Sequence, residues 1–204
     1  MQIPTLEQCY QLMCEMKMMD HIVRHSLQVC RVATFLTQNL KEQHYRLNFD
    51  LIRAASLLHD ITKTRSFKTE ENHALTGGQF LAEQGYPEIA ELVRQHVRLD
   101  EYPDPVVLGE AEIINYADKR VLHDKVVSLD RRLEYILERY GKLPENQERI
   151  QWLWERTLDL EKKIFSDLSF APEDLDRLLN HGNRPEEFIE YQKVCSLIED
   201  SGNV

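Results

Sequence analysis

Apolar residues recur at intervals of three and four positions along almost the whole chain, and this spacing most constrains its fold. It places apolar side chains on one face of an α-helix, whereas no segment shows a convincing alternation of apolar and polar residues typical of a half-buried strand. The sequence contains only seven glycines and seven prolines, too few for many hairpins or long flexible linkers. The pattern therefore predicts an all-α fold.

Helix ends are indicated by capping residues, prolines and glycines. Asn48 suits an N-cap, Pro87 suits a first helical turn, and Gly85 and Gly141 suit helix ends. The predicted helices cover about residues 5–17, 20–40, 49–59, 73–85, 87–98, 108–124 and 128–140, followed by a long helix containing Trp152 and Trp154 and two short helices that begin near Pro172 and Pro185. A polar segment at 60–72 separates the third helix from the fourth.

The segment GKLPEN, residues 141–146, is the only domain boundary that we mark. The sequence predicts a helical-bundle domain over residues 1–141 and a helical C-terminal extension over residues 142–204. The extension is more charged and has no cluster of histidine and aspartate. We expect it to pack on the core or on a partner, and a homodimer through these helices is one such arrangement.

The composition excludes several classes of protein. The net charge of −10, from 25 Lys and Arg against 35 Asp and Glu, opposes sequence-independent binding to nucleic acid, which needs a basic face. No window approaches the roughly 18 apolar residues of a membrane span, and the N-terminus lacks the pattern of a secretory signal. Cys9, Cys14, Cys30 and Cys195 are scattered without CxxC spacing, so we interpret them as separate thiols in a reducing cytoplasm rather than as metal ligands.

Five predicted helices each carry a histidine or an aspartate on an apolar stripe or at its end. The set is His25, His59, Asp60, His73, His96 and Asp118. A single histidine on an apolar face is usually a hydrogen-bonded core residue, but a buried, ionised carboxylate such as Asp118 is costly unless it is paired or binds a cation. Four histidines and two aspartates in one core would leave many polar groups without partners. A bound metal resolves this, and imidazole and carboxylate ligands suit Mn, Fe, Co, Ni or Zn.

The order of these residues resembles that in the HD-domain superfamily of metal-dependent phosphohydrolases, whose minimal signature is a His, a His-Asp pair and a distant Asp. The matching segments lie between residues 20 and 120 and read RHSLQVCRVA, AASLLHDITK, HALTGGQFL, VRQHV and INYADKR. The additional His73 and His96 make the pattern similar to that of the six-ligand, two-metal subgroup, which includes the symmetrical diadenosine tetraphosphate hydrolases. Thr62 stands where the commoner motif His-Asp-Ile-Gly-Lys has glycine, whereas Lys63 is retained.

The resemblance implies an HD-domain helical bundle that holds divalent transition metals, with iron or manganese expected before cobalt, nickel or zinc. In the implied scheme, His25, His59, Asp60 and Asp118 hold one ion, and Asp60 bridges to a second ion held by His73 and His96. The implied reaction is attack by water on a phosphoester or phosphoanhydride of a phosphorylated small molecule, expected to be a nucleotide. The most specific expectation from this resemblance is a dinucleoside polyphosphate substrate.

Asp60 and Lys63 are the expected catalytic residues. Lys63 follows the His-Asp pair by three residues, where it can contact a phosphate oxygen, and Arg65, Lys68 and Arg98 are weaker candidates for substrate binding. Two alternatives stay open. One is a mononuclear 5′-nucleotidase of the same superfamily, and the other is a non-catalytic, metal-stabilised regulatory module whose C-terminal helices bind a partner.

Overall fold

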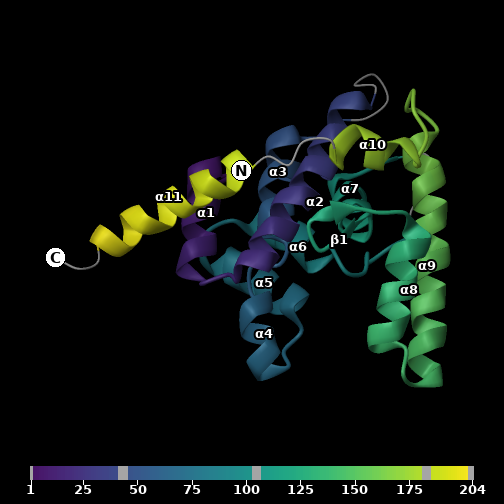
Figure 1. Ribbon diagram of the computed structural model, residues 1–204, viewed down its shortest axis with the longest axis horizontal. Helices are drawn as coiled ribbons and strands as arrows, with labels where there is room; N and C mark the ends of the chain where they lie inside the picture. Colours follow the sequence, from purple (N-terminus) through teal and green to yellow (C-terminus); the bar gives the residue numbers. More distant parts are fainter. Residues whose placement is uncertain (1, 41–45, 103–106, 181–184, 202–204) are drawn as a thin grey trace.

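The computed structural model describes residues 2–40, 46–102, 107–180 and 185–201 (Figure 1). The predicted all-α class is confirmed. The helices are α1 (Leu6–Glu15), α2 (Asp20–Asn39), α3 (Phe49–Leu58), α4 (Lys63–Thr69), α5 (His73–Glu83), α6 (Pro87–Arg94), α7 (Glu110–Lys119), α8 (Leu129–Tyr140), α9 (Pro144–Phe165), α10 (Asp174–Asn180) and α11 (Pro185–Ser201). β1 (Val121–Leu122) and β2 (Lys125–Val126) form a small antiparallel hairpin. Within the described ranges, no helix has the length and apolar character needed to cross a membrane.

Helix α2 runs through the centre of the bundle, where it packs against α3 and α7 (Figure 1). Its apolar stripe includes Val29, Val32 and Leu36, all fully buried. His25 lies on the same stripe, and it is also buried. The periodicity that forms α2 therefore also turns this imidazole toward the interior.

Helices α5 and α6 pack closely because α5 contains two adjacent glycines on the contact face. A Cβ atom at Gly78 would lie 2.9 Å from the carbonyl oxygen of Ala90 in α6, and one at Gly77 would lie 3.3 Å from two apolar side chains. His73 begins α5, and His96 follows α6 by two residues. The close approach of the two helices thus brings the two imidazoles together.

Four predicted elements differ from those observed, and one of them is the helix that begins at Pro185, which is 17 residues long rather than short. The helix predicted to reach residue 124 ends at Lys119, and the β1–β2 hairpin follows it. The hairpin is closed by Arg120, whose carbonyl accepts from the Val127 N–H at 2.8 Å, and its turn contains His123 with φ of 57°. The helix predicted to reach residue 98 ends at Arg94, and the polar segment at 60–72 contains α4.

The C-terminal helices lie at both ends of the bundle (Figure 1). Helices α8 and α9 are side by side at one end, and α11 lies along α1 at the other. Trp154 and Ile164 of α9, together with Phe188 and Tyr191 of α11, are buried in the same apolar cluster as the N-terminal helices. Core side chains therefore come from both sides of residue 141, and the domain boundary there stays a prediction.

The interpretation of four separate thiols is wrong for two of them. Cys14 in α1 and Cys195 in α11 form a disulfide with a Cα–Cα distance of 5.4 Å. The two residues are 181 positions apart, so no local spacing could pair them. An ion pair between Arg31 Nε and Glu187 Oε2 at 2.8 Å also holds α11, in this case against α2. Because disulfides are rare in a reducing cytoplasm, the cytoplasmic location stays a prediction.

Candidate metal centre

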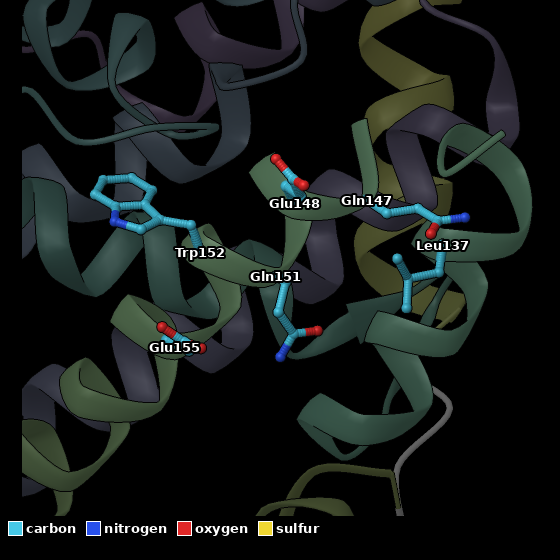
Figure 2. Close-up of a pocket in the computed structure, with 6 residues that line it drawn as sticks. All are labelled: Leu137, Gln147, Glu148, Gln151, Trp152 and Glu155. Carbon is cyan, nitrogen blue, oxygen red and sulfur yellow. The ribbon is translucent and has the colours of Figure 1, made fainter. Parts of the chain in front are cut away.

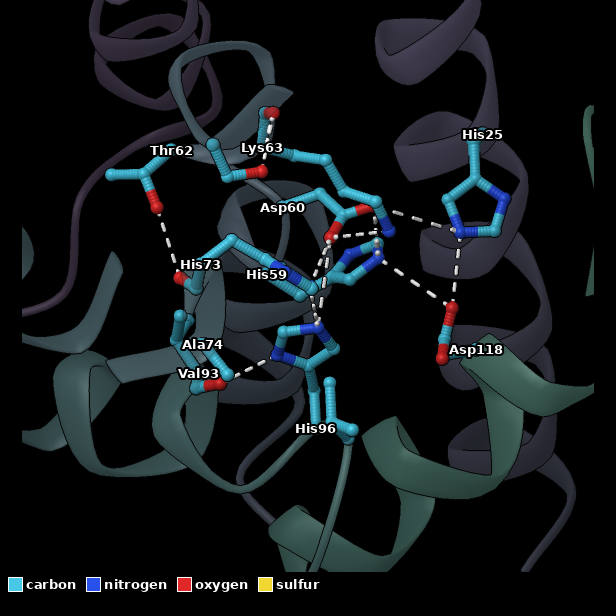
Figure 3. Close-up of polar contacts among 12 residues, drawn as sticks. His25, His59, Asp60, Thr62, Lys63, His73, Ala74, Val93, His96 and Asp118 are labelled. Carbon is cyan, nitrogen blue, oxygen red and sulfur yellow. Dashed lines mark hydrogen bonds and ion pairs between the residues drawn. The ribbon is translucent and has the colours of Figure 1, made fainter. Parts of the chain in front are cut away.

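The structure brings all six predicted ligand side chains into one cluster (Figure 3). They come from five parts of the chain: His25 from α2, His59 and Asp60 from the end of α3, His73 from the start of α5, His96 from the turn after α6, and Asp118 from the last turn of α7. Asp118 Oδ1 lies 3.0 Å from His25 Nε2 and 3.8 Å from His59 Nε2. Most of the cluster is buried, and His73 has the most exposed of these side chains, at 21%.

Asp60 lies between two pairs of histidines. Its Oδ2 is 3.4 Å from His59 Nε2 and 4.0 Å from His25 Nε2. Its Oδ1 is 3.2 Å from His73 Nε2 and 3.6 Å from His96 Nε2. Each carboxylate oxygen therefore faces a different pair of imidazoles.

Backbone carbonyls fix three of the rings. The Nδ1 atoms of His25, His59 and His96 lie 2.9, 2.7 and 2.6 Å from the carbonyl oxygens of His123, Ser56 and Val93. A carbonyl oxygen can only accept, so each Nδ1 carries the hydrogen and donates it. In the neutral ring the lone pair is then on Nε2, which points into the cluster.

This arrangement fits a divalent metal ion. His59 Nε2 is buried and has no hydrogen-bond partner among the described residues. The Nε2 atoms of His73 and His96 face each other at 3.2 Å, where a cation could accept both lone pairs. Two groups of potential ligand atoms, His25–His59–Asp118 and His59–Asp60–His96, each lie within 4.8 Å of one another. The donor set is imidazole and carboxylate, which suits transition metals.

The electrostatics of the cluster also favour a cation. Burial alone would raise the pKa of Asp60, but Lys63 and His59 outweigh it and hold that pKa well below its usual range. Burial opposes ionisation of Asp118 as well, but the close contact with His25 and the charge of Arg132 lower its pKa strongly. Burial lowers the pKa of His96 to about 4, which keeps this ring neutral and able to bind a metal. The site thus buries two carboxylates that remain ionised.

Lys63 and Thr62 connect the loop after α3 to the cluster. Lys63 Nζ lies 3.2 Å from Asp60 Oδ1 and 3.1 Å from Asp60 Oδ2. Thr62 is buried, and its hydroxyl donates to the carbonyl oxygen of His73 at 2.9 Å. Its φ of −101° is accessible to any residue, so the position does not need the glycine of the commoner motif.

The other predicted substrate contacts point elsewhere. Arg65 Nε forms an ion pair with Glu71 at 2.7 Å. The Arg98 guanidinium lies 5.6 Å from the centroid of the Trp152 ring. No contact found among the described residues joins Arg65 or Arg98 to the metal cluster. Figure 2 shows a pocket on the same α8–α9 end, lined by Leu137, Gln147, Glu148, Gln151, Trp152 and Glu155. Its lining includes none of the six clustered residues.

Two further groups belong to the centre, although the sequence patterns do not single them out. One is the backbone carbonyl of His123, which accepts the hydrogen bond from His25 Nδ1. The other is Arg132 in α8, whose Nη2 lies 3.8 Å from Asp118 Oδ1. The sequence feature that could have pointed to Arg132 is its spacing from Tyr135, Arg139 and Tyr140, which places an arginine and tyrosine cluster on one side of α8.

The fold and the site define an HD-domain protein, and the comparisons agree. The HD domain family matches residues 22–168, so the chain belongs to this family. Its members are metal-dependent phosphohydrolases that bind divalent metals and act on phosphorylated substrates, and the buried His and Asp cluster fits such a catalytic site.

Among its relatives is an uncharacterized protein of Methanocaldococcus jannaschii, with 28% identity over 144 residues that cover 64% of this chain and 84% of the relative. Ribonuclease Y of Petrotoga mobilis is 25% identical over 57% of this chain, and ribonuclease Y of Rubrobacter xylanophilus is 35% identical over 37% of it. These matches span only 22% and 13% of the two ribonucleases. No solved structure gives a significant match.

Proposed function

We propose that this chain is a two-metal phosphohydrolase that cleaves a phosphoanhydride or phosphoester bond of a nucleotide. The best specific substrate is a dinucleoside polyphosphate such as diadenosine tetraphosphate. The two carboxylate oxygens of Asp60 face different pairs of histidines, and this observation supports two ions. In this proposal, His25, His59 and Asp118 would hold one ion, His73 and His96 would hold the other, and Asp60 would serve as a ligand to both. Iron and manganese are the first candidates.

Each protein group has a defined task in this proposal. Bound divalent ions supply Lewis acidity and lower the pKa of a bound water. The carbonyl contacts at Nδ1 hold the imidazoles in orientation, so that Nε2 stays directed at the ligand position. Lys63 keeps its charge, because Asp60 and Asp118 outweigh the effect of burial and raise its pKa. With 28% of its side chain exposed, its ammonium can donate to a phosphate oxygen at the edge of the cluster.

Elemental analysis of purified protein, combined with a substrate panel, tests the proposal. The wild type is expected to hold about two equivalents of transition metal and to hydrolyse diadenosine tetraphosphate. His73→Ala is expected to lose one equivalent and most of the activity. His21→Ala, which removes an exposed imidazole of α2, is the matched control and should change neither.

Other results would identify the alternatives. One equivalent in the wild type, with nucleoside monophosphates hydrolysed equally well by His73→Ala, favours the mononuclear 5′-nucleotidase. Protein that contains no metal and takes none up on reconstitution favours the regulatory module. The panel includes an RNA oligonucleotide because of the similarity to ribonuclease Y. Cleavage of RNA alone would contradict the small-nucleotide substrate, which the net charge of −10 favours.

A further inference from the structure

One face of helix α8 begins beside the metal cluster, where Arg132 lies 3.8 Å from Asp118, and has no role in the ligand set described above. We define this α8 face by four residues: Arg132, Tyr135, Arg139 and Tyr140. Tyr135, Arg139 and Tyr140 follow Arg132 by three, seven and eight positions, so each lies on the side of the helix that carries Arg132. Their side chains alternate between a guanidinium and a phenol ring, in a chain whose net charge is −10. Such a local combination of cations and aromatic rings suits a nucleotide.

Arg132 is the member of this face closest to the cluster. Its side chain is 14% exposed, and its Nη2 lies 3.8 Å from Asp118 Oδ1, a distance that is too long for a hydrogen bond. Its Nε is buried and has no hydrogen-bond partner among the described residues. A guanidinium presents five N–H donors, and a buried donor without a partner is costly. The geometry therefore leaves donors of Arg132 available beside the cluster.

The two tyrosines differ in what surrounds them. The Tyr135 ring packs edge to face against His123 at 5.6 Å between centroids, and its hydroxyl accepts from Arg139 Nη1 at 3.1 Å. The Tyr140 ring has the Arg139 guanidinium 5.7 Å from its centroid, and 54% of the residue is exposed. Tyr135 is thus enclosed by protein contacts, whereas much of the surface of Tyr140 is open for stacking.

Tyr140 follows Arg132 by eight residues, so the two side chains project from α8 about two helical turns apart. Arg132 lies beside Asp118, and Tyr140 is the last residue of the helix. The open tyrosine therefore lies further along α8 than the arginine that contacts the cluster.

We propose that the α8 face is the nucleotide-binding wall of the site, in which Arg132 binds a phosphate from the Asp118 side and Tyr140 stacks on the base. This inference rests on the proposed function for the identity of the ligand as a nucleotide. It adds that specificity is divided between two residues of one helix. Arg132 recognises phosphate in any compound, and Tyr140 distinguishes a nucleotide from an inorganic polyphosphate.

Calorimetric binding to the metal-loaded protein, with inorganic pyrophosphate and ADP as probes, tests this division. Arg132→Gln is expected to weaken the binding of both probes about 10- to 100-fold, because charge-assisted hydrogen bonds to phosphate are lost. Tyr140→Ala is expected to weaken ADP about 10-fold, because a base loses its stacking partner, and to change pyrophosphate less than about 2-fold. The control is Arg131→Gln, which removes a 69% exposed arginine from the adjacent position and should change neither.

A second variant separates phosphate binding from support of Asp118. Arg132→Lys keeps a cation near Asp118 but loses the planar fork of donors. We expect it to keep the wild-type metal content and to weaken pyrophosphate about 5- to 10-fold. If Arg132→Gln loses metal while Arg132→Lys binds pyrophosphate like the wild type, Arg132 positions Asp118 and the proposal is overturned.

The remaining outcomes are equally distinct. If Arg132→Gln binds pyrophosphate like the wild type, Arg132 does not bind phosphate and that part of the proposal is overturned. If Tyr140→Ala affects both probes equally, Tyr140 does not stack on the base and that part is overturned. A wild type that binds neither probe would overturn the whole inference. If the wild type binds both probes equally and fails to cleave diadenosine tetraphosphate, base recognition by Tyr140 and the proposed substrate are both overturned. Phosphate binding by Arg132 is then still tested by Arg132→Gln.

Discussion

Glu161 in α9 should be essential to stability, because it neutralises a buried arginine of the HD bundle. Arg120 is 3% exposed in its side chain, and its Nη1 donates to Glu161 Oε2 at 2.9 Å and to the Tyr116 hydroxyl at 2.6 Å. The Tyr116 hydroxyl in turn donates to Glu161 Oε2 at 2.5 Å. The remaining Arg120 donors bind carbonyls, Nε to Val127 and Nη2 to Pro172, at 2.8 and 2.9 Å.

Replacing Glu161 by leucine would leave this guanidinium buried and uncompensated. Loss of one partner of a buried pair typically costs about 3–5 kcal/mol, and we expect a value in this range. The Asp159–Arg156 pair of the same helix is the control, since its side chains are 54% and 41% exposed. Asp159→Asn should cost only about 0–1 kcal/mol, because exposed pairs are screened by solvent.

Urea denaturation followed by far-UV circular dichroism measures both free energies of unfolding, provided that the slopes with denaturant agree. The double variant Arg120→Met/Glu161→Leu should be less destabilised than the sum of its single variants, because no charge is then left without a partner. A cost for Glu161→Leu as small as that for Asp159→Asn would refute the reasoning.

Three further predictions concern packing, the disulfide and the free thiols. Gly78→Ala should lower the free energy of unfolding by about 1–2 kcal/mol, because overpacking against α6 exceeds the gain of about 1 kcal/mol in helix propensity. Gln79 is exposed on the same helix, so Gln79→Ala should not lower it. Thermal denaturation compares the two variants. Reducing the Cys14–Cys195 disulfide should cost about 2–4 kcal/mol, measured by denaturation with and without dithiothreitol, and an unchanged midpoint would contradict a stable cross-link. Burial raises the pKa of Cys9 to about 12 from 9.0, so the folded state keeps a proton that the unfolded chain loses, and stability should fall as the pH rises from about 9 toward 12. Cys9→Ala should flatten this part of the stability profile, which denaturation at several pH values would show.

The sequence predicts well those features that depend on local periodicity. His25 and Asp118 are placed correctly because a buried helical stripe fixes the direction of each side chain on it. His73 begins its helix as predicted, whereas His96 lies in the turn after α6, where its Nδ1 donates to the carbonyl oxygen of Val93. The structure brings the six side chains together.

Features that depend on long-range pairing were not predictable in this way. Cys14 and Cys195 meet only because α11 packs along α1, which no local pattern indicates. The contact between Arg132 and Asp118 likewise requires the hairpin after α7 to reverse the chain, and the sequence predicted continued helix there. An apolar stripe records which face of a helix is buried, but not which neighbour covers it.

The end of α7 links the metal cluster to the C-terminal helices, so metal binding and the docking of these helices should affect each other. Asp118 faces the cluster, and Arg120, two residues later, binds Glu161 of α9 and the carbonyl of Pro172 before α10. If docking of α9 fixes the last turn of α7, then metal binding stabilises the docked form, and the coupling must be reciprocal. Glu161→Leu should therefore weaken metal binding although it contacts no ligand, whereas Asp159→Asn should not. Titration of the metal-free protein with manganese compares the two variants, and equal affinities would show that the C-terminal helices cover the bundle without supporting its site.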